Sequence, residues 1–436
     1  MPPDFPKRSW FNMLQTAKHW KEKINSGELK EQLRLLYGES AEKGGRGIFN
    51  LLDSYAMRFG DSPCALFSAS GRTELSGNHT DHQHGCVLCA AVMLDMTAAA
   101  APREDTRVCV LSEGFGEICV DISDLTIHEN EKGSSAALIR GVAKAMSKRG
   151  AKLRGFDAYI RSNVPQGSGL SSSAAYEVLI GEIFNELFSC GFSPTELAQF
   201  GQYAENKYFG KPCGLMDQMA SALGGVVFID FFDPAAPRFE QLDLSFEKYG
   251  YSICITNAGG SHADLTDEYA AITSEMLSVA RYFGKDVLRE VDEKEFFAAL
   301  PALRKTVTDR ALLRAMHYFS ENNRVELQLK ALKNGSIDDY LTLMESSGRS
   351  SMAMLQNVWA SGCTQERSLS LALAVSDSIL NGDGVSRVHG GGFAGTIQAL
   401  VPSEKARDYK NEMDRVFGEE ACHIIAVRPV GAYRIK

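Results

Sequence analysis

A loop rich in glycine and serine is the first stretch of this chain whose residue types could do chemistry. Residues 163–175 read Asn-Val-Pro-Gln-Gly-Ser-Gly-Leu-Ser-Ser-Ser-Ala-Ala. Gly167 and Gly169 have no Cβ, so the backbone N–H groups beside them can approach a phosphate group closely. The hydroxyls of Ser171–Ser173 can cap a helix, bind phosphate oxygens or coordinate Mg²⁺. The loop therefore indicates either a phosphate site or an ordinary turn closed by a serine cap.

A second polar loop, residues 71–85, lies between two apolar runs. Such a loop must face solvent or a ligand, because its polar groups cannot all be satisfied inside a core. It carries Arg72, Asn78, His79 and Asp81, a set of donors and acceptors that suits the binding of several hydroxyl groups at once. Its histidines suggest a transition-metal site as the alternative, but metal ligands so close together on one loop are uncommon and no distant Cys/His cluster completes a shell.

The elements around the first loop would aim it at an anion. Residues 156–160 alternate like a half-buried strand. After the loop, apolar residues recur every four positions from Ala175 to Leu187, with Glu177 and Glu182 on the other face. A loop that opens a helix meets the unpaired N–H groups and the positive end of the helix dipole. The loop is not a Walker A motif, since no Gly-Lys-Ser/Thr follows, and it lacks the third glycine of a dinucleotide-binding fingerprint.

The two loops resemble the first two signatures of the galactokinases, a family of GHMP small-molecule kinases. The family motifs usually read Gly-Arg-Val-Asn-Leu-Ile-Gly-Glu-His-Thr-Asp-Tyr and Pro-x-Gly-x-Gly-Leu-Ser-Ser-Ser-Ala. Residues 204–218 resemble the family's Glu…Gly-x-Pro-Cys-Gly-Ile-Met-Asp-Gln block, and residues 387–396 resemble its C-terminal glycine-rich loop. The four segments lie in the family's order, between about residue 45 and the end of the sequence.

The resemblance implies an α+β fold of two domains, with a ribosomal-S5-like N-terminal domain, a ferredoxin-like C-terminal domain and the active site between them. We expect a helical N-terminal extension over residues 1–45, longer than the usual lead-in of the family. An N-terminal kinase domain with the sugar and ATP loops would follow over 46–245, and a C-terminal kinase domain over 246–436. Periodicity in the second domain predicts helices near 266–284, 308–320, 325–333, 337–347 and 366–380.

The activity that the resemblance implies is transfer of the γ-phosphoryl group of ATP to the anomeric hydroxyl of a free sugar, with ATP and Mg²⁺ as cofactors. Asp217 would activate the hydroxyl, either by taking its proton or by its charge alone, and Arg72 would keep Asp217 ionised and contact the phosphoryl group. Glu205 would bind Mg²⁺ together with Ser172 and Ser173. As ordinary structural residues, Asp217 would be a salt-bridged aspartate and Glu205 a solvated helix residue. The ATP loop would comprise Gly167, Ser168, Gly169, Leu170, Ser171, Ser172 and Ser173.

The most direct substrate is galactose, which would become galactose 1-phosphate. The sugar-binding residues implied by the resemblance are Asn78, His79, Asp81, Gly214 and Tyr269. Asn78 and His79 would reach the hydroxymethyl group, while Asp81 would accept from two ring hydroxyls. Asn78 stands where the family has glutamate, and His82 stands where tyrosine is usual. An amide carries no charge, so kinases of an N-acetylhexosamine, a pentose or a uronic acid stay open as alternatives. A non-catalytic sensor of galactose and ATP is a separate alternative from a different functional class.

The composition is consistent with an enzyme that acts on small molecules. The chain has 436 residues and a formal net charge of −9 with acidic and basic residues mixed, which disfavours nucleic acid or an anionic membrane as a partner. No apolar run reaches the ~18 residues that a membrane span needs. The ten cysteines are scattered, mostly in apolar runs, as expected of reduced thiols in the cytoplasm. We therefore expect a cytoplasmic monomer or weak dimer whose partners are its sugar and ATP.

Overall fold

A computed structural model describes residues 13–165, 169–211, 213–259 and 265–436, and these form an α+β fold built on two sheets. In this part of the chain one sheet has eight strands and the other four. The strands are β1 (Ala65–Ser76), β2 (Cys86–Pro102), β3 (Arg107–Ser112), β4 (Glu117–Asp121), β5 (Phe156–Ser162), β6 (Val226–Asp230), β7 (Arg238–Leu242), β8 (Tyr251–Asn257), β9 (Val385–His389), β10 (Thr396–Pro402), β11 (Cys422–Ile425) and β12 (Tyr433–Ile435).

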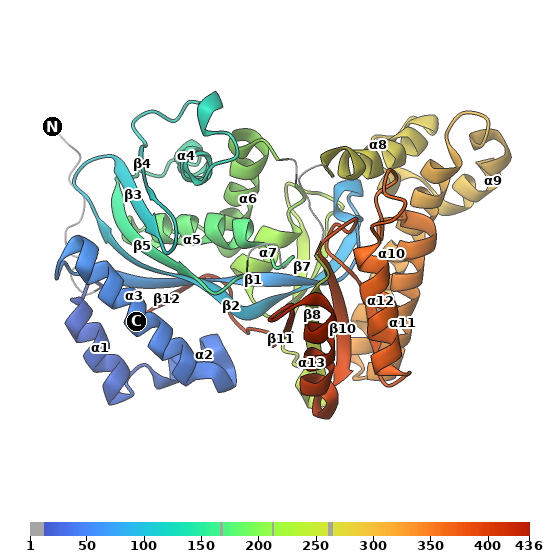
Figure 1. The fold of residues 1–436 in the computed structure, drawn as a ribbon. Coiled ribbons are helices and arrows are strands. Elements are labelled where there is room, and N and C mark those ends of the chain that lie inside the picture. The colour runs from blue at the N-terminus through green and yellow to red at the C-terminus, as the bar shows by residue number, and fades with distance from the viewer. Residues whose placement is uncertain (1–12, 166–168, 212, 260–264) are drawn as a thin grey trace.

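The larger sheet has the order β12-β1-β2-β5-β3-β4, with β6 pairing with β2 and β7 with β6, and the smaller sheet has the order β11-β8-β10-β9. Figure 1 shows the larger sheet between two layers of helices, with α1–α3 on one face and α4–α7 on the other. The helices are α1 (Ala17–Ser26), α2 (Lys30–Tyr37), α3 (Ala41–Phe59), α4 (Ser135–Lys148), α5 (Ser172–Leu187), α6 (Pro194–Ala204), α7 (Met216–Leu223), α8 (Thr266–Tyr282), α9 (Glu293–Leu303), α10 (Asp309–Lys333), α11 (Ile337–Ser350), α12 (Ser368–Leu380) and α13 (Ala406–Phe417).

Packing on both faces explains why β2 has no alternation of apolar and polar residues, since this strand contacts α5, α7, α10 and β11 as well as α3. Its first seven residues are Cys-Val-Leu-Cys-Ala-Ala-Val and all are buried, as expected of a strand covered on both sides. The same covering corrects the expectation for α5. Glu177 and Glu182, which the periodicity placed on a polar face, are both buried. Gly201 of α6 lies against the Glu177 side chain, whereas Arg434 of β12 and Lys436 lie near Glu182.

A single helix, α10, spans the stretch for which two helices, near 308–320 and 325–333, were expected. The apparent break is the polar run Glu-Asn-Asn-Arg at 321–324, yet Glu321 and Arg324 are buried. Glu321 accepts hydrogen bonds from the hydroxyl of Ser347 (2.7 Å) and the N–H of Gly77 (3.1 Å). The polar run is therefore part of a continuous helix and not a loop, with Glu321 and Arg324 on its buried side and Asn323 exposed.

Two other features differ from the sequence-based expectation. Cys109 and Cys119 lie opposite each other on β3 and β4 and form a disulfide, so the expectation of reduced thiols is wrong for this pair, while the other eight cysteines are free. The short strand β12 was not expected, and it pairs antiparallel with β1, so the end of the chain returns to the larger sheet. No helix in the described ranges is both long and apolar enough to cross a bilayer.

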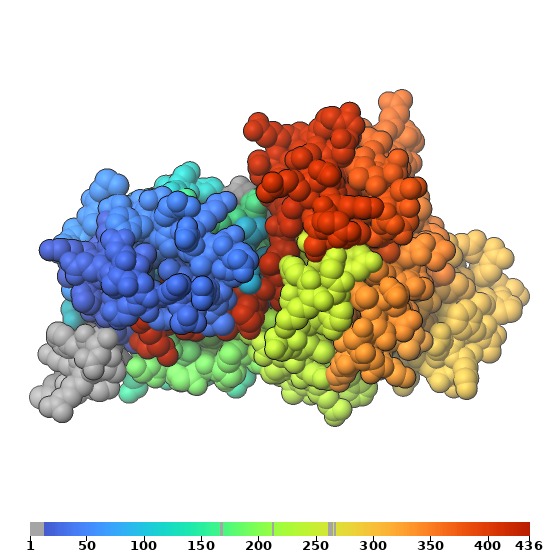
Figure 2. Space-filling view, turned by 90° about the horizontal axis from the view of Figure 1, so that it is seen from below, coloured from blue at the N-terminus to red at the C-terminus, as the bar shows by residue number. Residues whose placement is uncertain are grey.

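The N-terminal helices are packed against the larger sheet. Trp20 is 1% exposed and its indole N–H donates to the carbonyl of Cys64 (2.9 Å). The hydroxyl of Tyr37 donates to Asp95 on β2 (2.9 Å). Figure 2 shows these helices as one continuous surface at the opposite end of the molecule from α8 and α9. Helix α3 runs across residue 45, and the division of the chain at residues 45 and 245 stays a prediction.

Candidate active site

The described part of the glycine-serine loop packs against the C-terminal half of the chain. Gly169 has a φ of +70°, and a Cβ there would lie 2.4 Å from the hydroxyl of Thr396 and 3.0 Å from the Nδ1 atom of His389. Only glycine fits such a position. Ser171 precedes α5 with a φ of 54°, and its hydroxyl does not cap the helix but donates to Asp217. Gly167 and Ser168 lie outside the described residues.

Arg72 and Asp217 form a bidentate ion pair beside this loop. The Nε atom of Arg72 lies 2.6 Å from Oδ1 of Asp217, and its Nη2 atom lies 2.7 Å from Oδ2. The remaining Nη1 atom donates to the carbonyl of Gly169. Burial alone would raise the pKa of Asp217, but the charge and hydrogen bonds of Arg72 and the Ser171 hydroxyl outweigh it and hold this pKa below its usual value. Asp217 is therefore a carboxylate at neutral pH.

An irregularity in β1 aims Arg72 at this position. The pairing of β1 with β2 shifts register between Ser70 and Arg72, and such a bulge redirects the side chain that follows it. The N–H of Arg72 donates to the carbonyl of Leu170 (3.0 Å). A Cβ on Gly71 would lie 2.9 Å from the same oxygen. The first signature and the glycine-serine loop are thus in direct backbone contact.

Glu205 lies beside the start of α5, where hard oxygen ligands gather. Its Oε1 atom accepts from the hydroxyl of Ser173 (3.3 Å), and its Oε2 atom accepts from the amide of Gln218 (3.0 Å). The same amide donates to Glu177, whose other carboxylate oxygen has no hydrogen-bond partner among the described residues. Burial and the nearby charge of Glu205 raise the pKa of Glu177 well above its usual value. Buried carboxylate and hydroxyl oxygens are the donors that suit Mg²⁺.

The histidines of the second loop contact one another. The Nε2 atom of His79 lies 2.9 Å from the carbonyl of Gly391, and its Nδ1 atom lies 3.3 Å from Nε2 of His82. Gln83 contacts the remaining ring nitrogen of His82 at 3.3 Å. All three contacts fit neutral rings that each carry the proton on Nε2. Burial lowers the pKa of His79 to about 4 and that of His82 to about 3, so both rings are neutral at pH 7.

Asp81 faces Gly214 across the site. A Cβ on Gly214 would lie 1.6 Å from the Oδ2 atom of Asp81, so this contact requires glycine. Burial, with the negative charge of Asp217 as the next cause, raises the pKa of Asp81 to about 6. Tyr269 lies against the C-terminal glycine-rich loop, where its hydroxyl donates to the carbonyl of Gly392 (3.0 Å) and its ring packs edge-on against Phe393.

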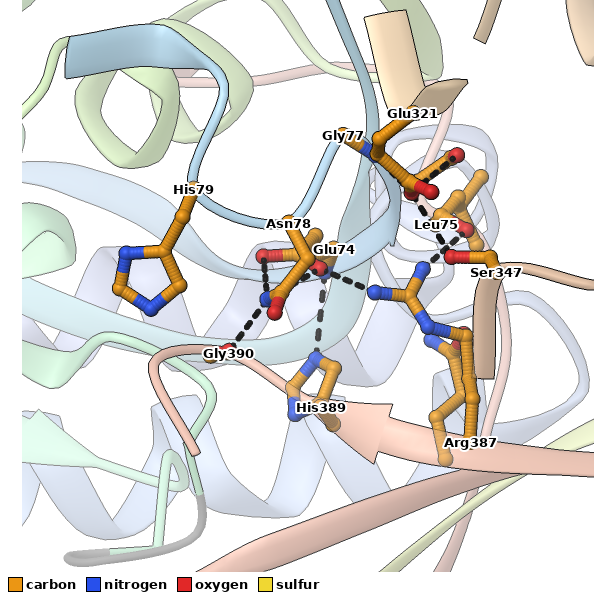
Figure 3. A network of polar contacts seen from close by, with 12 residues as sticks. Glu74, Leu75, Gly77, Asn78, His79, Glu321, Ser347, Arg387, His389 and Gly390 are labelled. Carbon is orange, nitrogen blue, oxygen red and sulfur yellow. Dashed lines mark hydrogen bonds and ion pairs between the residues drawn. The ribbon is translucent and has the colours of Figure 1, made fainter. Parts of the chain in front are cut away.

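Asn78 is completely buried, and its side chain is held by protein groups (Figure 3). Its amide nitrogen donates to the carboxylate of Glu74 (3.0 Å) and to the carbonyl of Gly390 (2.6 Å). Its amide oxygen accepts from the side chain of Asn357 (2.7 Å). These contacts come from β1, the C-terminal glycine-rich loop and the segment after α11.

Glu74, Arg387 and His389 are site residues that the sequence analysis missed. Glu74 is 3% exposed and pairs with the fully buried Arg387 at 2.5 Å. His389 accepts from the N–H of Glu74 (3.1 Å) and also contacts the hydroxyl of Thr396 (3.1 Å). A signal was present, because the family motif quoted above has asparagine where this chain has Glu74 and glutamate where it has Asn78. The two residue types exchange places.

The Arg72–Asp217 pair connects the glycine-serine loop with the loop of Asn78, His79 and Asp81. Asp217 lies at the start of α7, three residues after Gly214 and in contact with Ser171 of the glycine-serine loop. An ionised acid paired with an arginine therefore stands between a loop suited to phosphate and a loop suited to sugar hydroxyls. Positioning and charge stabilisation of this kind are what phosphoryl transfer needs from a protein.

Two family profiles match the segments that carry these residues. Residues 53–102 match the galactokinase galactose-binding signature. Residues 133–225 match the GHMP kinases N-terminal domain. The first segment contains Arg72 and the loop of Asn78, His79 and Asp81, and the second contains the glycine-serine loop, Glu205 and Asp217.

Solved structures of related kinases share the fold. The galactokinase of Lactococcus lactis, complexed with galactose, superposes with a TM-score of 0.76 at 25% identity over 88% of this chain and 99% of its own. The mevalonate kinase of Methanococcus jannaschii gives a TM-score of 0.58 at 14% identity over 84% of this chain and 98% of its own. The phosphomevalonate kinase of Streptococcus pneumoniae, in complex with phosphomevalonate and AMPPNP, gives 0.57 at 13% identity over 85% and 99%.

Proposed function

We infer that this chain, which belongs to the GHMP kinases and carries the galactokinase signature, is a sugar kinase that converts galactose and ATP into galactose 1-phosphate and ADP. The single observation that carries this proposal is the bidentate contact of Arg72 with Asp217 at the junction of the two loops. The galactose-binding signature and the likeness to a galactokinase complexed with galactose support the choice of sugar.

Asp217 is proposed to bind the anomeric hydroxyl and to receive its proton. A bond forms between the anomeric oxygen and the γ-phosphorus, and the bond from that phosphorus to the oxygen of ADP breaks. A carboxylate whose pKa lies below the usual value is a weak base. We therefore propose that Asp217 holds the hydroxyl by a hydrogen bond and takes the proton only as the new bond forms. Arg72 balances the charge of Asp217 and of the transferring group.

The sugar is proposed to lie between Asp81 and the C-terminal glycine-rich loop. Asp81 would accept hydrogen bonds from two ring hydroxyls, and its carboxylate is held against the backbone of Gly214, where a Cβ would lie 1.6 Å from Oδ2. His79 and Tyr269 both contact the C-terminal glycine-rich loop, at Gly391 and Gly392 respectively. The neutral ring of His79 can exchange its contact with Gly391 for one with the hydroxymethyl group.

ATP is proposed to bind with its phosphates at the start of α5. There Gly169, Leu170 and the serines at 171–173 precede the helix or form its first turn. Glu205, Ser172 and Ser173 would hold Mg²⁺, as their hard oxygens fit this ion. A bound Mg²⁺ would neutralise charge on the phosphate oxygens during transfer.

A sugar panel with Mg-ATP tests the proposal. The purified protein is incubated with galactose, glucose, N-acetylgalactosamine, arabinose or galacturonate, ADP release is followed, and the product is identified by phosphorus NMR. We expect galactose to give the highest kcat/KM and a 1-phosphate product. A higher kcat/KM with another sugar would contradict the galactose assignment, and no ADP release with any sugar would favour the sensor.

A further inference from the structure

Glu74 is a buried charge for which the proposed reaction has no direct use. Its carboxylate receives hydrogen bonds from Asn78 (3.0 and 3.3 Å) and from Arg387 (2.5 Å). Arg387 also donates to the carbonyl of Leu75 (2.8 Å). Burying an ion pair is costly unless its geometry and hydrogen bonds compensate, and the loss of one partner leaves an uncompensated charge. Because burying the Glu74–Arg387 ion pair costs folding free energy, its presence at the edge of the sugar site indicates a specific role there.

The amide of Asn78 has no hydrogen left for a sugar. A primary amide offers two N–H donors, and here one is directed to Glu74 and the other to the carbonyl of Gly390 at 2.6 Å. Its oxygen already accepts from Asn357 at 2.7 Å. The side chain is 0% exposed, and Figure 3 shows it pointing toward Glu74 and Gly390.

The carbonyls that these groups hold belong to one loop. Gly390 accepts from Asn78, while Gly391 accepts from Asn357 (3.2 Å) and contacts His79 (2.9 Å). The loop follows β9, which carries Arg387 and His389. Glu74 and Asn78 on one side, and β9 with its loop on the other, therefore form a fastening between the first signature and the C-terminal glycine-rich loop.

We propose that Glu74 and Asn78 act as one carboxylate–amide unit that fastens the C-terminal glycine-rich loop over the sugar site, so that Asn78 is a positioning residue and not a sugar ligand. The Glu74–Arg387 ion pair orients the amide of Asn78, and the amide holds Gly390. Recognition of the hydroxymethyl end of the sugar then falls to His79 and to the position of the loop. This inference rests on the proposed function and names which residues set the specificity of that same site.

Substitutions between amide and carboxylate of the same shape at positions 74 and 78 distinguish a positioning role of Asn78 from direct contact with the sugar. Asn78→Asp places a second carboxylate against Glu74 and removes the donors to Glu74 and Gly390. Glu74→Gln removes the carboxylate that pairs directly with the buried Arg387. The double variant Glu74→Gln/Asn78→Asp restores one amide and one carboxylate with the shape unchanged, so the amide introduced at position 74 can donate to the carboxylate introduced at position 78. Asn185→Asp is the matched control, since Asn185 also donates to a backbone carbonyl, that of Phe192 (3.2 Å), but lies on α5 away from the loop.

The readout is the ratio of kcat/KM for galactose to kcat/KM for 6-deoxygalactose, which lacks the hydroxymethyl oxygen. We expect Asn78→Asp to lower both values roughly tenfold or more and to leave their ratio within about twofold of wild type, with Asn185→Asp near wild type in both. A ratio that falls toward one in Asn78→Asp alone would mean that Asn78 contacts the hydroxymethyl oxygen, and would overturn the proposal.

The unfolding free energies of the two single variants and the double variant give a second, activity-free test. We expect the double variant to be more stable than the sum of the single effects allows, which is the mark of two residues acting as one unit. Additive changes in the unfolding free energy would contradict the proposal that Glu74 and Asn78 act as one unit. A wild-type protein inactive with every sugar would contradict the proposed function but not this coupling, so the two failures are distinguishable.

Discussion

The charge of Asp217 depends on two neighbours, Arg72 and Ser171, which outweigh the effect of burial on its pKa. Replacing the carboxylate by an amide removes the acceptor for the hydroxyl proton while keeping the shape. We predict that Asp217→Asn lowers kcat at least about a hundredfold, and Arg72→Ala does likewise because the developing charge loses its partner. Steady-state kinetics with galactose and Mg-ATP, together with circular dichroism to check folding, measure this.

The control for that prediction is Asp157→Asn. Arg103 contacts both oxygens of Asp157 at 2.8 and 3.0 Å, on β5 and away from the loops. Losing this similar contact should leave kcat within about twofold. Near-normal turnover in Asp217→Asn would remove Asp217 from the catalytic role, and a comparable loss in Asp157→Asn would mean that general destabilisation explains both.

Asp81 makes activity and stability respond to pH in opposite directions. Its pKa is raised from 3.8 to about 6, chiefly by burial. Below pH 6 the carboxyl holds a proton and loses acceptor capacity, so we predict that kcat/KM for galactose falls as the pH drops from 7 to 5. Because the folded protein binds this proton more tightly than the unfolded chain, its contribution to stability is full below about pH 4 and is lost as the pH rises through 6.

Asp81→Asn should therefore melt at a higher temperature than wild type at pH 7 but not at pH 4, and should bind galactose poorly at both. Differential scanning fluorimetry at the two pH values and a galactose titration measure these outcomes. An equal melting temperature of the two proteins at pH 7 would mean that ionised Asp81 costs no folding free energy, contrary to the prediction.

At the scale of elements, α7 and the segment just before it carry Asp217 and Gly214, which faces Asp81 of the sugar loop. Gly214 precedes this helix, and a Cβ there would lie 1.6 Å from Oδ2 of Asp81, so Gly214→Ala must displace the carboxylate or the start of α7. We predict that Gly214→Ala raises KM for galactose roughly tenfold or more, since misplacement by about 1 Å has large effects in such sites. Kinetics over a range of galactose concentrations measure it, with KM for ATP as the internal reference.

Gly362→Ala is the control, because Gly362 has a negative φ and a Cβ there meets no atom within 4 Å. An unchanged KM for galactose in Gly214→Ala would show that the backbone at 214 does not approach the sugar. Equal rises in the KM values of galactose and ATP would instead indicate a general disturbance of α7.

At the scale of the whole molecule, the N-terminal helices and the C-terminal segment meet on one buried carboxylate. Asp95 accepts from Tyr37 of α2 (2.9 Å), from Ser68 of β1 and from Arg428, which precedes β12 (3.3 Å). We predict that Tyr37→Phe lowers the free energy of unfolding by about 1–3 kcal/mol, because a buried acceptor loses a donor, and leaves kcat unchanged. Urea denaturation measures the stability.

Tyr282→Phe is the matched control, since it removes the same hydroxyl from a side chain that is 43% exposed. A Tyr37→Phe variant as stable as wild type would mean that the N-terminal helices contribute little to the fold. A large loss of kcat would mean that they position the site.

The sequence by itself determined the residues of the two loops and most elements that carry them. Glycines spaced two apart, three serines and a following apolar helix are local features, and so is the strand near 64–69. The expected loop at 71–85 began too early, because β1 continues to Ser76 and buries residues 71–76. Their pairing across 145 residues of sequence, from Arg72 to Asp217, was expected only because the motifs resemble a known family. Local periodicity carries no information on which distant loops meet.

Only the tertiary structure decided what surrounds those loops. Glu177 and Glu321 read as solvated or loop residues in the sequence, but α6 covers one and Ser347 with Gly77 binds the other. Asn78 was expected to bind the sugar, and the structure directs its donors to Glu74 and Gly390, which is why a positioning role is proposed for it. A sequence does not show whether a polar side chain is buried. In a folded interior each of its donors and acceptors needs a partner, and some of these partners, such as Gly390 for Asn78, lie hundreds of residues away in the chain.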